Sequence, residues 1–173
     1  MAGHSKWSQI KHKKGLSDQA KGALFSKLAR AISLAARGNP DPKTNLNLAR
    51  AIERARELNM PNESIERAVK RVHDRSQAQL EELRLEALGP GGVALIILVI
   101  ADNKNRSLAE IKSVLAEHGA HLVHEGSLLW MFKKDNPVQV PISAEVAREL
   151  DRLREILDAH PDVQQVSSNE TRG

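Results

Sequence analysis

Residues 93–101 read VALIILVIA, which is the longest uninterrupted apolar run in the 173-residue chain. Nine residues are too few for a membrane-spanning helix, which needs about 20, and they match the length of a β-strand. The tetrapeptide at 89–92, Gly-Pro-Gly-Gly, is a turn signal, and residues 83–88 before it again have strand character. This part of the chain is therefore expected to begin with two strands joined by a tight turn.

The segments that follow alternate between helical and extended patterns. A helix capped by Ser107 leads into an apolar strand over residues 127–132, and a turn joins that strand to another over 138–142. A helix capped by Ser143 and a strand over 163–168 close the order. From residue 93 onward this is the β-α-β-β-α-β order of a ferredoxin-like domain, with an antiparallel sheet and both helices on one face.

The first half of the chain has a helical period instead. Apolar residues spaced three and four apart predict three short amphipathic helices, the first capped by Ser17 or Asp18 and the second by Thr44 or Asn45. None can bury its apolar stripe alone, so the three should pack as a small bundle. The sequence thus predicts the α+β class, and its domains are a basic helical domain over 1–75, a linker over 76–82 and a ferredoxin-like domain over 83–173.

The two halves differ in charge. Residues 1–75 carry 16 Lys and Arg against 7 Asp and Glu, a net charge of +9, whereas residues 76–173 carry 10 against 15, a net charge of −5. A solvated helical surface is the general explanation of a charge run, but +9 within 75 residues favours contact with nucleic acid. The chain has no cysteine, which excludes disulfides, thiol catalysis and cysteine-ligated zinc and fits a reducing, cytoplasmic location.

Candidate catalytic and metal-binding residues are few. His118, His121 and His124 lie three residues apart, with Glu125 beside them, and such residues can bind zinc. The predicted helix ends between the first and second histidine, however, so this spacing does not bring the rings to one face. The 89–92 turn lacks the GK[ST] ending of a phosphate-binding loop and precedes a strand rather than a helix. We therefore expect no enzyme, no bound metal and no cofactor.

The amino terminus is a cationic arm with one large aromatic residue. Residues 1–15, MAGHSKWSQIKHKKG, hold four lysines, and the first acid in the chain is Asp18. Lysines on such a segment neutralise phosphates without a rigid mould, and Trp7 either stacks on an exposed base or anchors the arm to the helical bundle. The candidate phosphate contacts are Lys6, Lys11, Lys13, Lys14, Lys21, Lys27 and Arg30. The candidate base or sugar contacts are Trp7 and His12, and the helical residues that could extend the surface are Arg50, Arg54, Arg67 and Arg71.

The predicted strand order is also that of an RRM, which stacks bases on aromatics of its two central strands. Residues 93–101 and 138–142 contain no aromatic, and the chain has no tyrosine. Because the second half is also acidic overall, we assign nucleic-acid contact to the first half.

Seven segments resemble the YebC/PmpR family, in order over nearly the whole chain. They are MAGHSKWSQIKHKK, DQAKGALFSKL, NMPNESIERAV, GPGGVAL, ADNKNRS, LLWMF and DVQQVSSN. Within the second segment, Asp18, Lys21, Phe25 and Lys27 match the family's pattern. The resemblance implies a helical N-terminal domain followed by two α+β domains, and it implies no enzymatic activity. It also implies a role as a DNA-binding transcriptional regulator or, as for mitochondrial translational activators of a cytochrome oxidase subunit, in translation at the ribosome.

The chain departs from the family pattern after Phe132. The family inserts a third domain there, whereas this chain has a short turn followed by residues that resemble the family's return into its second domain. The third domain thus looks excised. The segment NLNLA at 45–49 replaces the family's NPRLR and loses two arginines, and GAHLV at 119–123 replaces its GG-N-L-G pattern.

Together these features predict a cytoplasmic, non-enzymatic regulator that binds nucleic acid and no membrane. The sequence contains no helix-turn-helix with a clear base-reading set and no dimer heptad, and a flexible lysine arm suits irregular RNA, so ribosomal RNA and the ribosome are the favoured partners. Three alternatives stay open: promoter DNA as the target, a protein-interaction module with a merely solvated basic surface, and a metal-dependent hydrolase built on the histidine loop. The sequence leaves the oligomeric state open.

Overall fold

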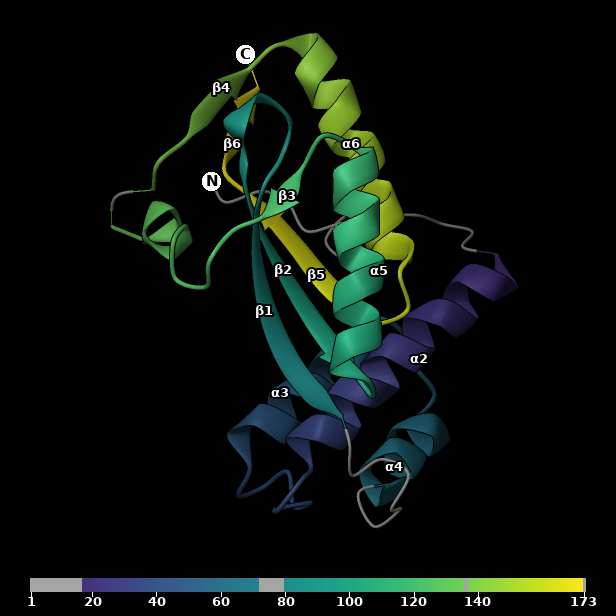
Figure 1. Cartoon of the computed structure of the whole chain (residues 1–173). Helices are drawn as coiled ribbons and strands as arrows, with labels where there is room; N and C mark the ends of the chain where they lie inside the picture. The colour runs from purple at the N-terminus through teal and green to yellow at the C-terminus, as the bar shows by residue number, and fades with distance from the viewer. Residues whose placement is uncertain (1–16, 72–79, 136, 173) are drawn as a thin grey trace. The chain divides into compact units, whose positions relative to one another are not determined.

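The structure is a computed structural model that describes residues 17–71, 80–135 and 137–172 (Figure 1). These residues form two compact units. The helical unit comprises residues 17–71, 80–81 and 100–103, and the α+β unit comprises residues 82–99 and 104–172.

The helical unit is built from α2 (Asp18–Ala35), α3 (Leu46–Glu57) and α4 (Asn62–Lys70). Both predicted caps form: the Ser17 hydroxyl accepts the backbone N–H of Ala20 at 3.3 Å, and the Asn45 carboxamide accepts that of Leu48 at 3.1 Å. Helix α2 packs against both α3 and α4. The buried apolar residues of the three helices are Leu24, Leu28, Ile32, Leu48, Ile52, Ala55, Ile65 and Ala68. The predicted three-helix bundle is therefore confirmed.

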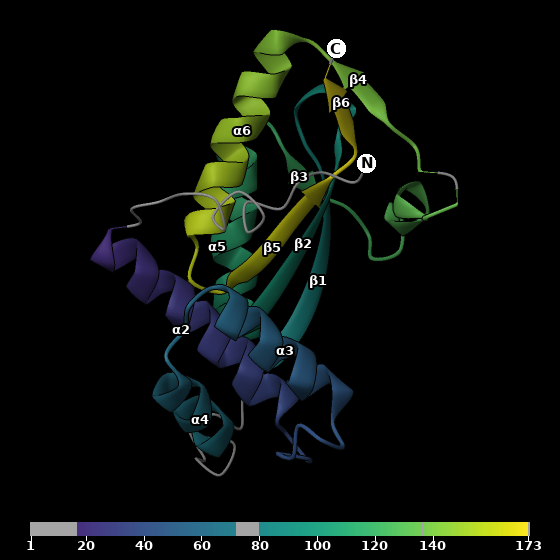
Figure 2. The same ribbon diagram turned by 180° about the vertical axis from the view of Figure 1, so that it is seen from behind.

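The α+β unit contains a four-stranded sheet in the order β3-β1-β2-β5. Its strands are β1 (Glu81–Leu88), β2 (Ala94–Ala101), β3 (His121–Leu122) and β5 (Val163–Ser168), and β3 runs antiparallel to β1 as β5 does to β2. The two helices α5 (Lys104–Glu117) and α6 (Ala144–Ala159) lie on the same side of the sheet, to the right of its strands in Figure 1 and to their left in Figure 2. A separate parallel pair joins β4 (Val140–Ile142) to β6 (Glu170–Arg172). The α+β class, with both helices on one face, is confirmed.

Strand β2 is buried on both faces, as its uninterrupted apolar sequence predicts. Ala94 and Ile96 pack with Leu128 and with the short 3₁₀ helix η4 (Leu129–Phe132). Side chains alternate along a strand, so Leu95, Ile97 and Val99, none of them exposed, point to the opposite face, which α5 and α6 cover.

The prediction of a strand over 127–132 is wrong, because this segment forms a turn followed by η4. The reason is Glu86 on β1, which is 1% exposed. Its two carboxylate oxygens accept the backbone N–H groups of Gly126 and Leu128, each at 2.6 Å. A side chain thus supplies the acceptors that a neighbouring strand would otherwise provide.

Other boundaries also differ from the sequence-based expectation. Strand β1 begins inside the predicted 76–82 linker, and β1 rather than residues 138–142 lies beside β2. The 138–142 segment does contain a strand, β4, but it pairs with β6, which was not predicted. Helix α5 begins three residues before Ser107, whose hydroxyl bonds to a carboxylate of another segment instead of capping the helix.

Candidate nucleic-acid interface

The arm residues proposed from the sequence lie outside the described part of the chain. They are Lys6, Trp7, Lys11, His12, Lys13 and Lys14. The remaining three candidates, Lys21, Lys27 and Arg30, lie on α2.

The three α2 candidates have different surroundings. The Lys21 side chain is 51% exposed, and its ammonium lies 4.0 Å from the exposed Asp18 carboxylate. Lys27 is only 5% exposed, which differs from the exposed cation expected, because it follows Leu24 by three residues and shares the buried face of the helix. Arg30 is half-buried and donates to the backbone carbonyl of Ile100 in the same unit at 3.5 Å. Of the three, Lys21 is therefore the one with an open surface for phosphate.

Further cations lie on α3, on α4 and beside them. Residues 17–71 contain eleven Lys and Arg against six Asp and Glu. Those exposed beyond α2 are Arg37, Lys43, Arg50, Arg54, Arg56, Arg67, Lys70 and Arg71. The sequence-based set missed Arg37, Lys43, Arg56 and Lys70. Arg56 and Lys70 could have been identified from their positions away from the buried apolar residues of α3 and α4. Arg37 and Lys43 lie in the polar segment between α2 and α3, where exposure is the usual expectation.

Some of these cations interact with neighbouring groups, which makes them less available for contact with phosphate. Arg67 pairs with Glu63 one turn earlier at 3.0 Å, and both side chains are mostly exposed, so the pair contributes little to stability. Arg37 donates to the backbone carbonyl of Leu80 at 2.8 Å. Burial lowers the pKa of Arg54, and the Glu57 carboxylate opposes that shift. The basic surface is thus interspersed with acids rather than continuous.

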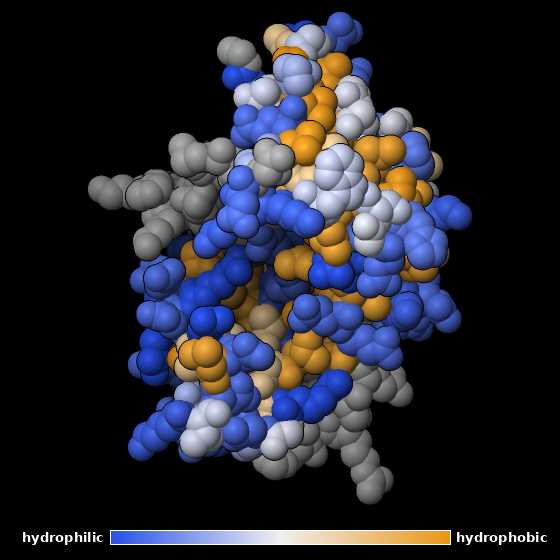
Figure 3. All heavy atoms as spheres, turned by 90° about the vertical axis from the view of Figure 1, so that its left-hand side faces the viewer, coloured by the Kyte–Doolittle hydropathy of each residue, from blue (hydrophilic) through white to orange (hydrophobic). Residues whose placement is uncertain are grey.

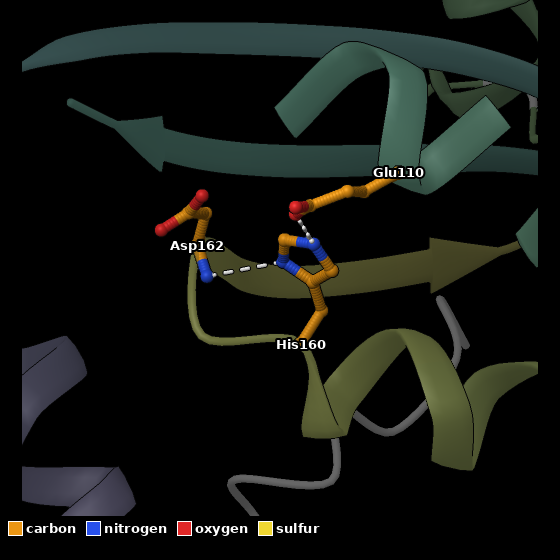
Figure 4. Close-up of side chains that lie close together, drawn as sticks. All are labelled: Glu110, His160 and Asp162. Atoms are coloured by element: carbon orange, nitrogen blue, oxygen red, sulfur yellow. Dashed lines mark hydrogen bonds and ion pairs between the residues drawn. The ribbon is translucent and has the colours of Figure 1, made fainter. Parts of the chain in front are cut away.

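A group of titratable side chains gathers in the α+β unit, where α5 meets the turn between α6 and β5 (Figure 4). Glu110, His160 and Asp162 each have one nitrogen or oxygen atom that could coordinate a metal, and these three atoms lie within 4.8 Å of one another. The backbone N–H of Asp162 donates to Nδ1 of His160 at 3.2 Å, so the ring proton lies on Nε2, which donates to Glu110 at 2.9 Å. Among the described residues, the loop with His118, His121 and His124 forms no such group.

The Asp162 carboxylate has no exposed surface and bonds to side chains of α5. One of its oxygens accepts the Ser107 hydroxyl at 2.6 Å and the Arg106 guanidinium at 2.9 Å. An adjacent guanidinium disfavours a second cation at this carboxylate. The arrangement is therefore a hydrogen-bond network that joins the start of α5 to the α6–β5 turn, and the expectation that no metal binds stays a prediction.

The sequence matches two family models. The TACO1/YebC protein N-terminal domain matches residues 5–75, and the TACO1/YebC second and third domain matches residues 80–139. This chain belongs to the TACO1/YebC family. The resemblance seen in its motifs is confirmed, and the N-terminal family domain coincides with the basic half of the chain.

Relatives in the TACO1/YebC family are named probable transcriptional regulatory proteins. The one from Dictyoglomus turgidum is 42% identical over 98% of this chain and 68% of that protein. Those from Brachyspira hyodysenteriae and Halothermothrix orenii are 43% and 44% identical over 92% of this chain, and the matches cover 65% and 64% of their length. The chain thus spans about two thirds of the length of these relatives.

A solved structure has the same fold. The crystal structure of a conserved hypothetical protein, Aq1575 from Aquifex aeolicus, is 29% identical, with a TM-score of 0.80 and 98% of each chain covered. Within the described residues, no helix is both long and apolar enough to cross a membrane.

Proposed function

We propose that this member of the TACO1/YebC family is a cytoplasmic, non-enzymatic regulator of gene expression that binds nucleic acid through its basic N-terminal half. The observation that carries the proposal is the charge division. The net charge is +9 over residues 1–75, close to the limits of the N-terminal family domain, and −5 over the remainder. A polyanion is attracted to the first part and repelled by the second.

The basic half of the chain would bind nucleic acid by neutralising its phosphates. Each lysine or arginine that contacts a phosphate releases condensed counterions, and this contribution does not depend on sequence. Lys21 has an exposed side chain for this purpose, and the four arm lysines proposed from the sequence add to it. Lys27 is buried, so we leave it out of the contact set.

Ribosomal RNA is the target we favour. The exposed cations of the helical unit are distributed over three helices, and on α3 the acids Glu53 and Glu57 alternate with arginines. Such a mixed surface is poorly suited to reading base edges in a major groove from one recognition helix. It is compatible with backbone contacts on an irregularly folded RNA.

The second candidate is a DNA-binding transcriptional regulator. It is favoured by the names of the relatives, which are probable transcriptional regulatory proteins. The two candidates share the same polyanion chemistry and differ in the nucleic acid recovered from cells. Crosslinking followed by sequencing separates them, because ribosomal RNA supports the first and promoter fragments support the second.

A salt titration tests the nucleic-acid binding itself. If about five cations contact phosphate, log K should fall against log salt with a slope of roughly −3.5 on single strands and −4.5 on duplex DNA. Replacing Lys11, Lys13 and Lys14 by Ala should flatten the slope by about two to three. The matched control replaces the exposed Lys104 and Lys112 of α5 and should leave it unchanged. Equal slopes for wild type and triple variant would refute the role of the arm.

A further inference from the structure

Trp130 is an exposed aromatic in the half of the chain to which no binding role has been given. It lies on η4 and is 53% exposed, whereas the other two aromatics in the described part of the chain, Phe25 and Phe132, are half-buried. A tryptophan ring is large and is usually well buried, so an exposed one needs an explanation.

The Trp130 ring is held in a fixed orientation. Its indole N–H donates to the backbone carbonyl of Ser127 at 2.8 Å, which satisfies the one polar group of the side chain. What the ring still offers to a partner is its apolar face. A ring fixed in this way loses little conformational entropy when a ligand stacks on it.

The backbone beneath the ring is also fixed. Leu129, Met131 and Phe132 pack against the cluster that contains Ala94 and Ile96. Glu86 holds the backbone before η4, and the backbone N–H of Val138 donates to the Met131 carbonyl at 2.9 Å behind it. The backbone that carries the Trp130 side chain is therefore held in place by core packing and by hydrogen bonds.

Two cations follow η4 directly. Lys133 and Lys134 are both exposed, and neither forms an ion pair with another residue in the described part of the chain. Asp135, also exposed, is the one acid among residues 128–135. Positive charge thus lies within a few residues of the ring, in a unit that is otherwise acidic.

The surroundings fit a flat polar ligand better than an apolar protein surface. The neighbours of the ring in sequence, Leu129 and Met131, are already packed into the core. Figure 3 shows the side of the molecule on which η4 and β4 lie, and hydrophobic and hydrophilic side chains are mixed over its upper half. A partner protein that docks by apolar contact needs an apolar surface around the ring, whereas two exposed lysines follow η4 directly.

We propose that Trp130 stacks on an unpaired nucleobase while Lys133 and Lys134 contact the flanking phosphates. Every nucleobase has a π-face, so this contact selects single-stranded over duplex nucleic acid without reading a sequence. The inference rests on the proposed function and adds to it a second contact, located in the α+β unit, and a class of target. RNA and DNA single strands share this chemistry, and the experiment distinguishes them.

Fluorescence provides the direct test. The chain has two tryptophans, so the Trp7→Phe variant of the full chain leaves Trp130 as its one indole fluorophore. We expect saturable quenching of that fluorescence by oligouridylate or oligothymidylate and little quenching by a duplex. The oligonucleotide that quenches the fluorescence at the lower concentration shows whether RNA or DNA is the preferred single strand. Quenching that is equal for duplex and single strands would overturn the proposal.

Affinity measurements on variants give a second readout. Trp130→Ala should weaken binding of a labelled single strand by about fivefold or more and leave duplex binding unchanged, while Trp130→Phe should recover part of the loss. Ile156 on α6 is 41% exposed, and Ile156→Ala is the matched control with no expected effect. Replacing Lys133 and Lys134 by Ala should reduce the salt slope on single strands by about 1.4.

The two proposals fail in different ways. If the wild-type chain binds neither RNA nor DNA at moderate salt, the proposed function fails. If the wild-type chain binds single strands but Trp130 fluorescence does not change and Trp130→Ala binds within about twofold of wild type, only the stacking proposal fails. In that second case capture of a partner protein through Trp130 would be the explanation of its exposure.

Discussion

Replacement of Glu86 by Gln should destabilise the α+β unit although the two side chains have nearly the same shape. Each carboxylate oxygen accepts a different backbone N–H, from Gly126 and from Leu128. A carboxamide has one oxygen and one NH₂ group, so it can accept one of these donors and must oppose the other. Loss of one charge-assisted bond and one unsatisfied N–H near the buried Leu128 together cost about 2–4 kcal/mol.

Urea unfolding, followed by Trp130 fluorescence in the Trp7→Phe background, measures this cost in the unit that contains Glu86. The matched control is Glu82→Gln on the same strand, where the side chain is exposed, and it should change the free energy of unfolding by less than about 0.5 kcal/mol. If Glu86→Gln unfolds within about 0.5 kcal/mol of the parent, Glu86 does not hold the turn before η4.

Three further changes test the packing elsewhere. Asp162→Ala should cost about 2–4 kcal/mol, because it leaves the buried Ser107 hydroxyl without its acceptor; a loss below about 1 kcal/mol in thermal unfolding would contradict this. Gly91→Ala should cost about 2–3 kcal/mol, since Gly91 has φ +69° and an added Cβ would lie 2.7 Å from a methyl carbon of Val146, and an unchanged urea midpoint would argue against it. Gly22→Ala should instead stabilise the helical unit by about 0.5–1 kcal/mol, because Gly22 is inside α2 and an added Cβ meets nothing within 4 Å. Thermal unfolding followed by helical circular dichroism should show a higher midpoint, and an unchanged midpoint would contradict this prediction.

Local sequence signals were sufficient for most of the elements. The helices of the first half begin at the predicted caps, Ser17 and Asn45, because capping depends on residues within three positions of each other. Ser143 likewise caps α6 by accepting the backbone N–H of Val146. The apolar run in β2 was correctly placed in the middle of the sheet, because few other positions can bury both faces of a strand.

The errors arose where a distant side chain determines the local structure. Glu86 lies about 40 residues before the segment it holds, and Asp162 lies 55 residues after Ser107. A serine before an apolar stripe predicts a helix cap, and an apolar run predicts a strand, unless such a partner is present. No pattern in the neighbourhood of residues 107 or 127–132 contains that information.

The candidate site was predictable in its charge but not in its exposure. The net charge of the first half follows from composition alone, whereas the burial of Lys27 depends on which face α2 turns to its neighbours. In the sequence Trp130 is part of the apolar segment LLWMF, and the prediction for residues 127–132 is an apolar strand. Its exposure follows from η4, whose tighter turn cannot bury all of its side chains on one side.

Charge and stacking would have different roles in one chain. Under the proposed function, the cations of the first half would supply affinity that is independent of sequence and decreases steeply with salt. A single stacked base adds only about 1–3 kcal/mol, too little to hold a complex alone. Once the basic half is bound, however, the second contact is intramolecular, and its free energy adds without a second loss of translational freedom. The preference for single strands should therefore persist at high salt, where phosphate contacts weaken, and it should disappear there in Trp130→Ala.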